Sequence, residues 1–308
     1  MSQSNSQSVS VKQAALSTLA YFDLFEIPLT LEEVQKQLLF TEASLDELGE
    51  TLDQSPQLRK MEDRYGLKGD IYFLEAFHQK QLRAQEYWKR VERWRWLLEL
   101  CPFVEGVSIC NSLPIENIEE NSDIDLLIHA KEGHLFSARI FTVFFTHFFG
   151  LRRHGKKTRK RFCLSFYTTP EAWDFTTLQR GPYDIYLAYW LKTLQPITGD
   201  LALHQAFLGT NLAWLNNFFA HPELDASRLK KSRWWTRALK NLLEKIFGSP
   251  TWENRFKGWL WDRMQRKKSA LPNASGTIIT EHMLKFHDHD AREEISKKWL
   301  EGLAQIDV

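Results

Sequence analysis

The chain has 308 residues, of which 43% are hydrophobic, so it can bury a sizeable core and is not expected to be globally disordered. Forty basic residues face 39 acidic ones, and the net charge of +1 excludes a global attraction to nucleic acid or to anionic membranes. The three cysteines, Cys101, Cys110 and Cys163, follow no metal-knuckle spacing. We expect them to be buried thiols of a reducing compartment.

The N-terminus is a polar Ser/Gln-rich tail over residues 1–8, without the apolar core of a signal peptide. The most apolar run, residues 135–151, contains Arg139 and His147 and is shorter than the ~20 residues that a spanning helix needs. It predicts a buried helix. We therefore expect a cytoplasmic protein with no membrane partner.

Residues 9–75 have the element order of a winged helix. Helical spacing over 11–22 is followed by two helix starts, at Thr30 with Glu33 three residues on, and at Ser44 with Glu47 three residues on. Two short β-like runs, 58–61 and 71–74, then flank a turn-rich segment. This pattern predicts three helices and a hairpin.

The rest of the chain divides by its hydrophobic pattern. Residues 76–101 predict a connector helix that Pro102 ends, and residues 102–175 predict a small mixed α/β core. The core consists of strands over 104–110, 124–129 and 162–168 and a helix over 135–150. Residues 176–308 predict an all-helical C-terminal region, with segments near 182–195, 203–219, 228–247, 252–267, 276–286 and 290–305.

The stretch 107–128, VSICNSLPIENIEENSDIDLLI, carries the chemistry. A strand ends at Asn111 and Ser112, and ten residues later Asp123 and Asp125 enter an apolar strand. Alternation along a strand places these two carboxylates on one face. Their repulsion is relieved by a hard divalent cation, which gains oxygen ligands. In phosphoryl transfer such a pair holds Mg²⁺.

This stretch resembles the signature of the DNA-polymerase-beta-like nucleotidyltransferase superfamily: a hydrophobic strand, Gly-Ser, about ten residues, then Asp-hydrophobic-Asp-hydrophobic. The resemblance covers about residues 104–170. It implies that Asn111 and Ser112 begin a helix and contact the phosphates of an NTP. It also implies that Asp123 and Asp125 bind Mg²⁺ or Mn²⁺ and act catalytically. The expected reaction moves a nucleoside monophosphate to a hydroxyl acceptor, whether small molecule, protein or nucleic acid.

The chain departs from the family pattern in two places. After the first strand, Asn111 replaces glycine and Pro114 lies where the family helix begins. The third strand, 162–168, lacks the usual third carboxylate; Cys163, Ser165 and Tyr167 are expected to share its face. The alternative is therefore a catalytically degraded nucleotide-binding or DNA-associated regulatory protein of the same fold.

The N-terminal segments TLAYFDLFEIPLTLEEV and YGLKGDIYFL resemble the winged-helix segment found ahead of this core in a poorly characterised group of bacterial proteins. Its third helix is acidic, which favours docking over DNA binding. The basic loop 151–162 can hold a triphosphate or a polynucleotide backbone, or be a solvated loop. Arg139 can pair with a carboxylate or a phosphate. The run 287–290, His-Asp-His-Asp, can bind a metal ion or cap the following helix.

Overall fold

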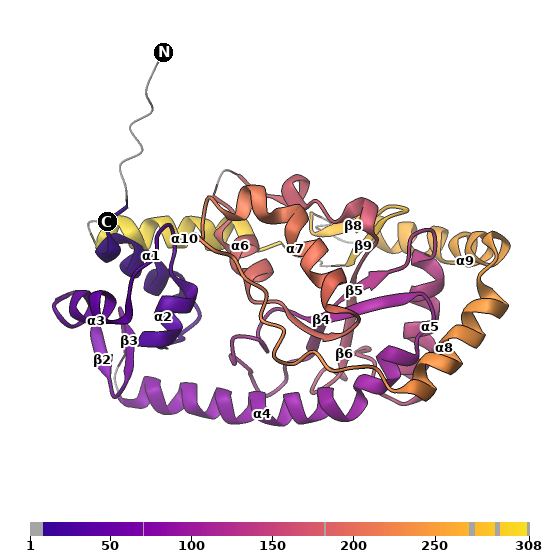
Figure 1. The fold of residues 1–308 in the computed structure, drawn as a ribbon, viewed down its shortest axis with the longest axis horizontal. Coiled ribbons are helices and arrows are strands. Elements are labelled where there is room, and N and C mark those ends of the chain that lie inside the picture. Colours follow the sequence, from indigo (N-terminus) through magenta and orange to yellow (C-terminus); the bar gives the residue numbers. More distant parts are fainter. Residues whose placement is uncertain (1–8, 70, 182, 271–274, 287–289, 307–308) are drawn as a thin grey trace, which may run out of the picture.

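The computed structural model describes residues 9–69, 71–181, 183–270, 275–286 and 290–306 (Figure 1). An N-terminal module lies at one end of an elongated molecule and a mixed sheet lies toward the other. The long helix α4 (Ile71–Leu100) runs beneath both parts.

The described part of the N-terminal module contains three helices and a three-stranded antiparallel sheet of order β1-β3-β2. Its elements are α1 (Val11–Asp23), β1 (Leu29–Thr30), α2 (Leu31–Gln37), α3 (Leu45–Asp53), β2 (Arg59–Met61) and β3 (Arg64–Gly66). The expected helix starts are confirmed: Thr30 forms a capping box with Glu33, and the Ser44 hydroxyl accepts the Glu47 N–H.

The expected strand at 71–74 is wrong. The hairpin closes earlier, through a turn at Glu62, whose φ of 56° is left-handed, and β3 ends at Gly66. Residues from Ile71 onward instead begin α4. A short apolar run allows a strand or a helix equally. Leu74 and Phe77 are buried at helical spacing, so packing against the N-terminal module favours the helix.

The described part of the core contains a six-stranded mixed sheet of order β7-β4-β5-β6-β9-β8. Its strands are β4 (Val104–Ile109), β5 (Ile124–Ala130), β6 (Phe162–Thr168), β7 (Gln195–Thr198), β8 (Thr277–Ile279) and β9 (Met283–Phe286). Only the β5–β6 pair is parallel among these strands; the other pairs are antiparallel. The three core strands expected from the sequence are present, and the fold is mixed α/β.

The expectation of an all-helical C-terminal region is wrong. Residues 276–286 form the β8–β9 hairpin, and β7 joins the opposite edge of the sheet beside β4. The edge of β6 has backbone groups to satisfy, and β9 pairs with it at Tyr167 and Leu284. The remaining helices follow the expected segments: α6 (Ile185–Lys192), α7 (Leu201–Leu215), α8 (Trp234–Phe247), α9 (Pro250–Ser269) and α10 (Arg292–Gln305).

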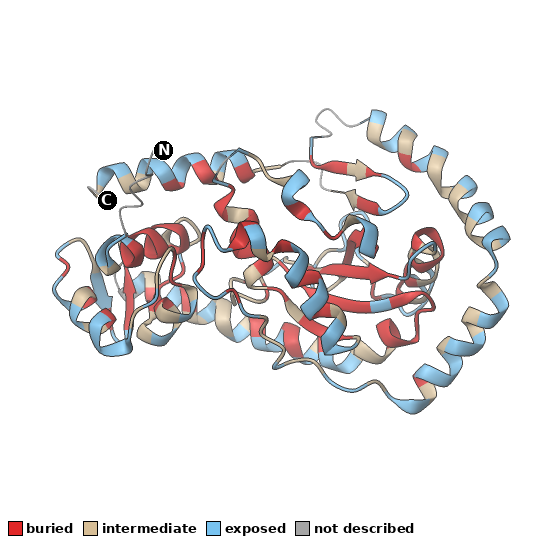
Figure 2. Ribbon diagram, turned by 45° about the horizontal axis from the view of Figure 1, so that its top comes forward, coloured by how far each residue is buried: buried red, intermediate tan, exposed pale blue. Residues whose placement is uncertain are grey.

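Helices cover both faces of the sheet, whose strands are mostly buried (Figure 2). One face packs against α4, α9 and α5 (Leu135–Phe148), and the other packs against α6 and α7. The C-terminal helix α10 returns to the N-terminal module, where the Trp299 indole donates to the Ser17 carbonyl at 2.9 Å. Helices α1 and α10 thus share one hydrophobic core.

The apolar run 135–151 becomes α5, and its burial is uneven. Leu135 and Ala138 are buried, whereas Phe144 and Phe148 near its end are exposed. Within the described residues, no helix combines the length and the apolarity that crossing a membrane requires. Cys101, Cys110 and Cys163 are buried free thiols, as expected.

Candidate metal and phosphate site

The two aspartates lie at the start of a central strand. Asp123 directly precedes β5 and Asp125 is its second residue, with both side chains half-buried. Parallel pairing with β6 places Cys163 opposite Asp125. One oxygen of each carboxylate and the Cys163 sulfur all lie within 4.8 Å of one another. The arrangement therefore offers three ligand atoms to a single ion.

Burial and charge crowding both act on Asp125. Burial, and next the neighbouring charge of Asp123, raise the pKa of the Asp125 carboxyl to about 6. A hydrogen bond from the Asn111 side chain opposes this rise. Asp125 is thus held in a place where its negative charge is costly without a cation beside it.

The basic loop supplies one counter-charge. Arg153 Nη1 lies 2.7 Å from Asp123 Oδ2 and 3.6 Å from Cys163 Sγ. Backbone hydrogen bonds anchor Arg153 beside the start of β6, where its N–H donates to the Phe162 carbonyl at 2.9 Å. One guanidinium beside two carboxylates leaves the group with excess negative charge, which suits a cation.

Asn111 adopts the backbone conformation that glycine would supply. Its φ is 63°, in the left-handed region that Asn tolerates better than most residues. Its side-chain oxygen accepts the Trp190 indole N–H at 2.7 Å, which leaves the amide to face Asp125. Asn111 is therefore a bridge between β4, the aspartates and α6.

Residues 111–116 form turns, and not the helix that the family resemblance implies. The Ser112 carbonyl accepts the Asn117 N–H at 2.9 Å, and the Leu113 carbonyl accepts the Glu116 N–H at 3.1 Å. Pro114 has no N–H to donate to a helical ladder, and Glu116 has a positive φ of 55°. Ser112 remains beside the site, half-buried, in a tight turn.

The third strand differs from the expectation at one point. A register shift between Asp125 and Leu127 pairs Leu127 with Phe166, so β6 bulges between Cys163 and Phe166. Tyr167 consequently points to the opposite face, where its hydroxyl lies 2.7 Å from Thr142 Oγ1. Cys163 therefore remains at the site without Tyr167.

Among the described residues, no carboxylate pairs with Arg139. Its Nη1 donates to the Leu164 carbonyl at 3.2 Å, and its guanidinium carbon lies 4.2 Å from the Phe286 ring centroid. The interaction is structural and joins α5 to the β-hairpin at the sheet edge.

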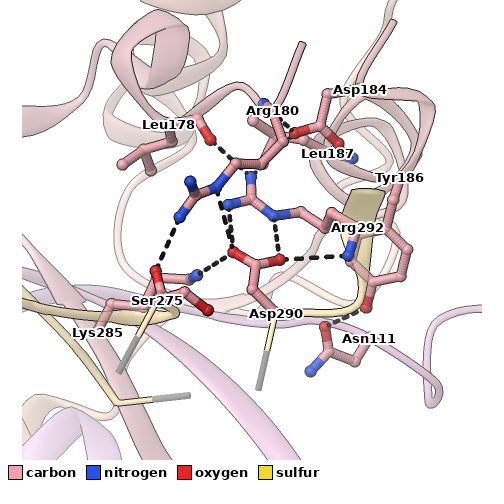
Figure 3. Close-up of polar contacts among 10 residues, drawn as sticks. All are labelled: Asn111, Leu178, Arg180, Asp184, Tyr186, Leu187, Ser275, Lys285, Asp290 and Arg292. Atoms are coloured by element: carbon pink, nitrogen blue, oxygen red, sulfur yellow. Dashed lines mark hydrogen bonds and ion pairs between the residues drawn. The ribbon is translucent and has the colours of Figure 1, made fainter. Parts of the chain in front are cut away.

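A second charged cluster lies beyond Tyr186, whose hydroxyl is 3.5 Å from Asn111 Oδ1 (Figure 3). Arg292 pairs with Asp290 at 2.6 Å and with Asp184 at 3.0 Å. Lys285 Nζ and Arg180 Nε also lie within 4 Å of Asp290 Oδ2. This cluster connects α6, the sheet and α10.

Residues 287–289, which carry the two histidines of the expected metal alternative, lie outside the described residues. Asp290 accepts the Arg292 backbone N–H at 3.3 Å at the start of α10. The N-cap of α10 is nevertheless Ala291, without a side-chain cap hydrogen bond, so the expectation that Asp290 is the N-cap is wrong.

An open cavity of about 480 Å³ lies elsewhere, between α2, α3 and the segment after α7. Lys192 lines it, and burial lowers the pKa of that amine to about 8. No residue of the candidate site is among those that line it. Geometry of ligand atoms, and not cavity size, identifies the candidate site.

No family model matches the chain, and neither a curated protein nor a solved structure matches it significantly. The functional interpretation rests on the residues and their geometry. The sequence placed Cys163 on the third strand and Arg153 in the basic loop, but it did not predict that either contacts the aspartates. Those contacts depend on which strand and loop lie beside the aspartates.

Proposed function

We propose that the chain is a metal-dependent nucleotidyltransferase, which moves a nucleoside monophosphate from an NTP to a hydroxyl acceptor. The observation that supports it is the convergence of Asp123 and Asp125 with the left-handed turn at Asn111, on the ends of two adjacent strands. Two carboxylates with a backbone turn beside them suit a metal-bound triphosphate.

The donor set fits a divalent cation. Asp123 and Asp125 would hold Mg²⁺ or Mn²⁺, which would neutralise triphosphate charge and favour deprotonation of the attacking hydroxyl. A sulfur ligand favours softer metals than Mg²⁺, so a site that includes Cys163 should bind Mn²⁺ more tightly than Mg²⁺. Asn111 and Ser112 would orient the phosphates through backbone N–H groups and the Ser112 hydroxyl.

Arg153 has a role in this proposal as well. Its guanidinium is half-exposed and pairs with Asp123. With a cation between the aspartates, the same guanidinium is positioned to pair with a phosphate. The basic loop thus changes partner when substrate binds.

The alternative function is nucleotide binding without transfer. It is favoured by Cys163, which stands where a third carboxylate would complete the metal site or act as a base. For the N-terminal module we propose a winged helix that docks onto another protein. The acidic side chains of α3, among them Asp46 and Glu47, disfavour phosphate contact.

Calorimetric titration with each NTP, with and without Mg²⁺ or Mn²⁺, tests the proposal. We expect metal-dependent binding to the wild type and its loss in Asp125→Asn, which also abolishes transfer. Glu120→Gln, an exposed carboxylate on the loop between β4 and β5, is the matched control and retains both. Unchanged transfer by Asp125→Asn would refute the assignment.

A gain-of-function variant separates the two candidates. Cys163→Asp restores a third oxygen ligand, so we expect Mg²⁺ to support transfer at roughly tenfold lower concentration. Cys163→Ser adds no carboxylate and serves as the control. Tight NTP binding with no product from the wild type, with Mn²⁺ and varied acceptors, would favour the binding protein.

A further inference from the structure

The charge of the chain is concentrated in one arm. Residues 228–268, which contain α8 and most of α9, hold thirteen Lys and Arg against three Asp and Glu, a net charge of +10. The whole chain carries +1, so the remaining residues are net −9. The arm forms the outer edge of the molecule, opposite the N-terminal module (Figures 1 and 2). Such a segment attracts an anionic surface over about a Debye length.

Helix α8 also exposes apolar side chains. Leu239, Leu242 and Ile246, at i, i+3 and i+7, are 41%, 53% and 54% exposed, and Trp234 at the helix start is 80% exposed. The inner side of the same helix packs against α5, where the ring centroids of Phe247 and Phe141 lie 5.1 Å apart. α8 therefore has an apolar stripe that no described residue covers, in addition to its buried side.

Helix α9 repeats the combination with one exposed aromatic side chain. Trp259 is 63% exposed. Arg255, Arg263 and Arg266 stand four residues before it, four after it and seven after it, so they share its side of the helix. An indole flanked by guanidinium groups is typical of the boundary between water and hydrocarbon.

A chain of ring contacts extends this surface to α5. Phe148, 74% exposed, lies 5.2 Å from Phe149 between ring centroids, Phe149 lies 5.7 Å from Trp96, and Trp96 lies 5.5 Å from Trp235 of α8. Phe144, 58% exposed, stacks on Phe148. The basic loop 151–162, with seven Lys and Arg, follows directly in the sequence.

We infer that α8, α9 and the end of α5 bind the surface of an anionic lipid membrane. The expectation of no membrane partner followed from the net charge of the whole chain and from the length of its most apolar run. An interfacial helix needs neither, because it inserts its apolar side and keeps its basic side in the headgroups. This inference does not depend on the proposed function.

Two other occupants fit less well. Proteins bind nucleic acid through phosphate contacts and aromatic stacking, and neither interaction involves exposed aliphatic side chains such as Leu242 and Ile246. A second copy that applied the same arm would oppose one +10 segment to another, which repels. A lipid surface is the occupant that takes both the aliphatic stripe and the positive charge.

Sedimentation of the full chain with vesicles tests the inference. We expect it to pellet with vesicles of phosphatidylcholine mixed with phosphatidylglycerol, not with phosphatidylcholine alone, and to bind less as salt rises. Leu242→Glu/Ile246→Glu should weaken binding at least roughly tenfold, because it removes insertion and adds two negative charges. The matched control, Leu82→Glu/Leu300→Glu, makes the same change at exposed positions on α4 and α10 and should lose much less.

Circular dichroism and the melting temperature establish that both double variants fold as the wild type does, since all four positions are exposed. Failure of the wild type to pellet with the anionic vesicles overturns the inference. Equal weakening by the two double variants overturns it too, because the effect is then one of charge alone. Binding to a labelled oligonucleotide without vesicle binding assigns the arm to nucleic acid.

Discussion

Two clusters in this molecule each contain a pair of aspartates, and they differ in how their charge is compensated. Asp184 and Asp290 meet Arg180, Lys285 and Arg292, and Asp184 also accepts the Leu187 and Arg180 backbone N–H groups at 3.0 Å and 2.9 Å. Asp123 and Asp125 meet one half-exposed guanidinium, that of Arg153.

This difference in compensation separates a structural role from a candidate binding role. Asp184 is 1% exposed with hydrogen bonds on both oxygens, so its cluster resembles a staple between α6 and α10. Burial raises the pKa of both Asp184 and Asp125, but the charge of Arg292 lowers that of Asp184, whereas the charge of Asp123 raises that of Asp125 further. The ionised form of Asp125 is thus costly, and a site that stores such a cost gains when a cation arrives.

The largest effect is expected from breaking the compensated cluster. Arg292→Met leaves Asp184 and Asp290 buried with less counter-charge, so we expect the free energy of unfolding in urea to fall by about 3 kcal/mol. Lys297→Met is the control, because its pair with Glu301 at 3.7 Å is exposed on both sides and should cost at most about 0.5 kcal/mol. Equal losses in the two variants would contradict the distinction.

His129 extends the comparison of the two aspartate pairs to a buried polar group whose ring nitrogens have no hydrogen-bond partner among the described residues. It is fully buried on β5. Burial, with the nearby His204, holds the His129 pKa well below its usual 6.5. The folded protein keeps this ring neutral while the unfolded chain takes up a proton, so stability is lost as pH falls below about 6.5.

His129→Leu should remove that loss. We expect it to stabilise the protein by about 2 kcal/mol at pH 5 relative to its effect at pH 7.5, measured by urea unfolding at both values. His221→Leu, at an exposed position beside Glu42, is the control and should not gain stability at pH 5. A pH-independent effect of His129→Leu would show that the ring takes up a proton at the same pH in the folded and unfolded states, and would contradict the lowered pKa.

The smallest effect concerns the undercompensated pair. Without metal, Asp125→Asn removes the charge that burial and Asp123 oppose, so we expect stability at pH 7 to rise by about 1 kcal/mol. The variant keeps the volume and a hydrogen-bonding side chain. Thermal unfolding in a chelator measures the effect, and a clear loss of stability would place Asp125 with the structural aspartates.

Local sequence determined the helix starts and the core strands, because those signals act within a few residues. Thr30 and Ser44 satisfy backbone donors three residues away, and the apolar strands at β4, β5 and β6 require burial on both faces. The spacing from Asn111 to Asp125 was equally local, since alternation and turn chemistry follow from the chain itself. That spacing predicted which residues form the candidate site.

Tertiary structure decided what depends on contacts between distant segments. The run 276–286 became a hairpin because β6 offered an unpaired edge, and residues from Ile71 became helix because Leu74 and Phe77 had a module to pack against. A bulge in β6 kept Cys163 beside Asp125 and turned Tyr167 away, and the basic loop brought Arg153 to Asp123. Composition near each residue cannot determine these outcomes, because strand edges, bulges and ion pairs are satisfied by partners far away along the chain.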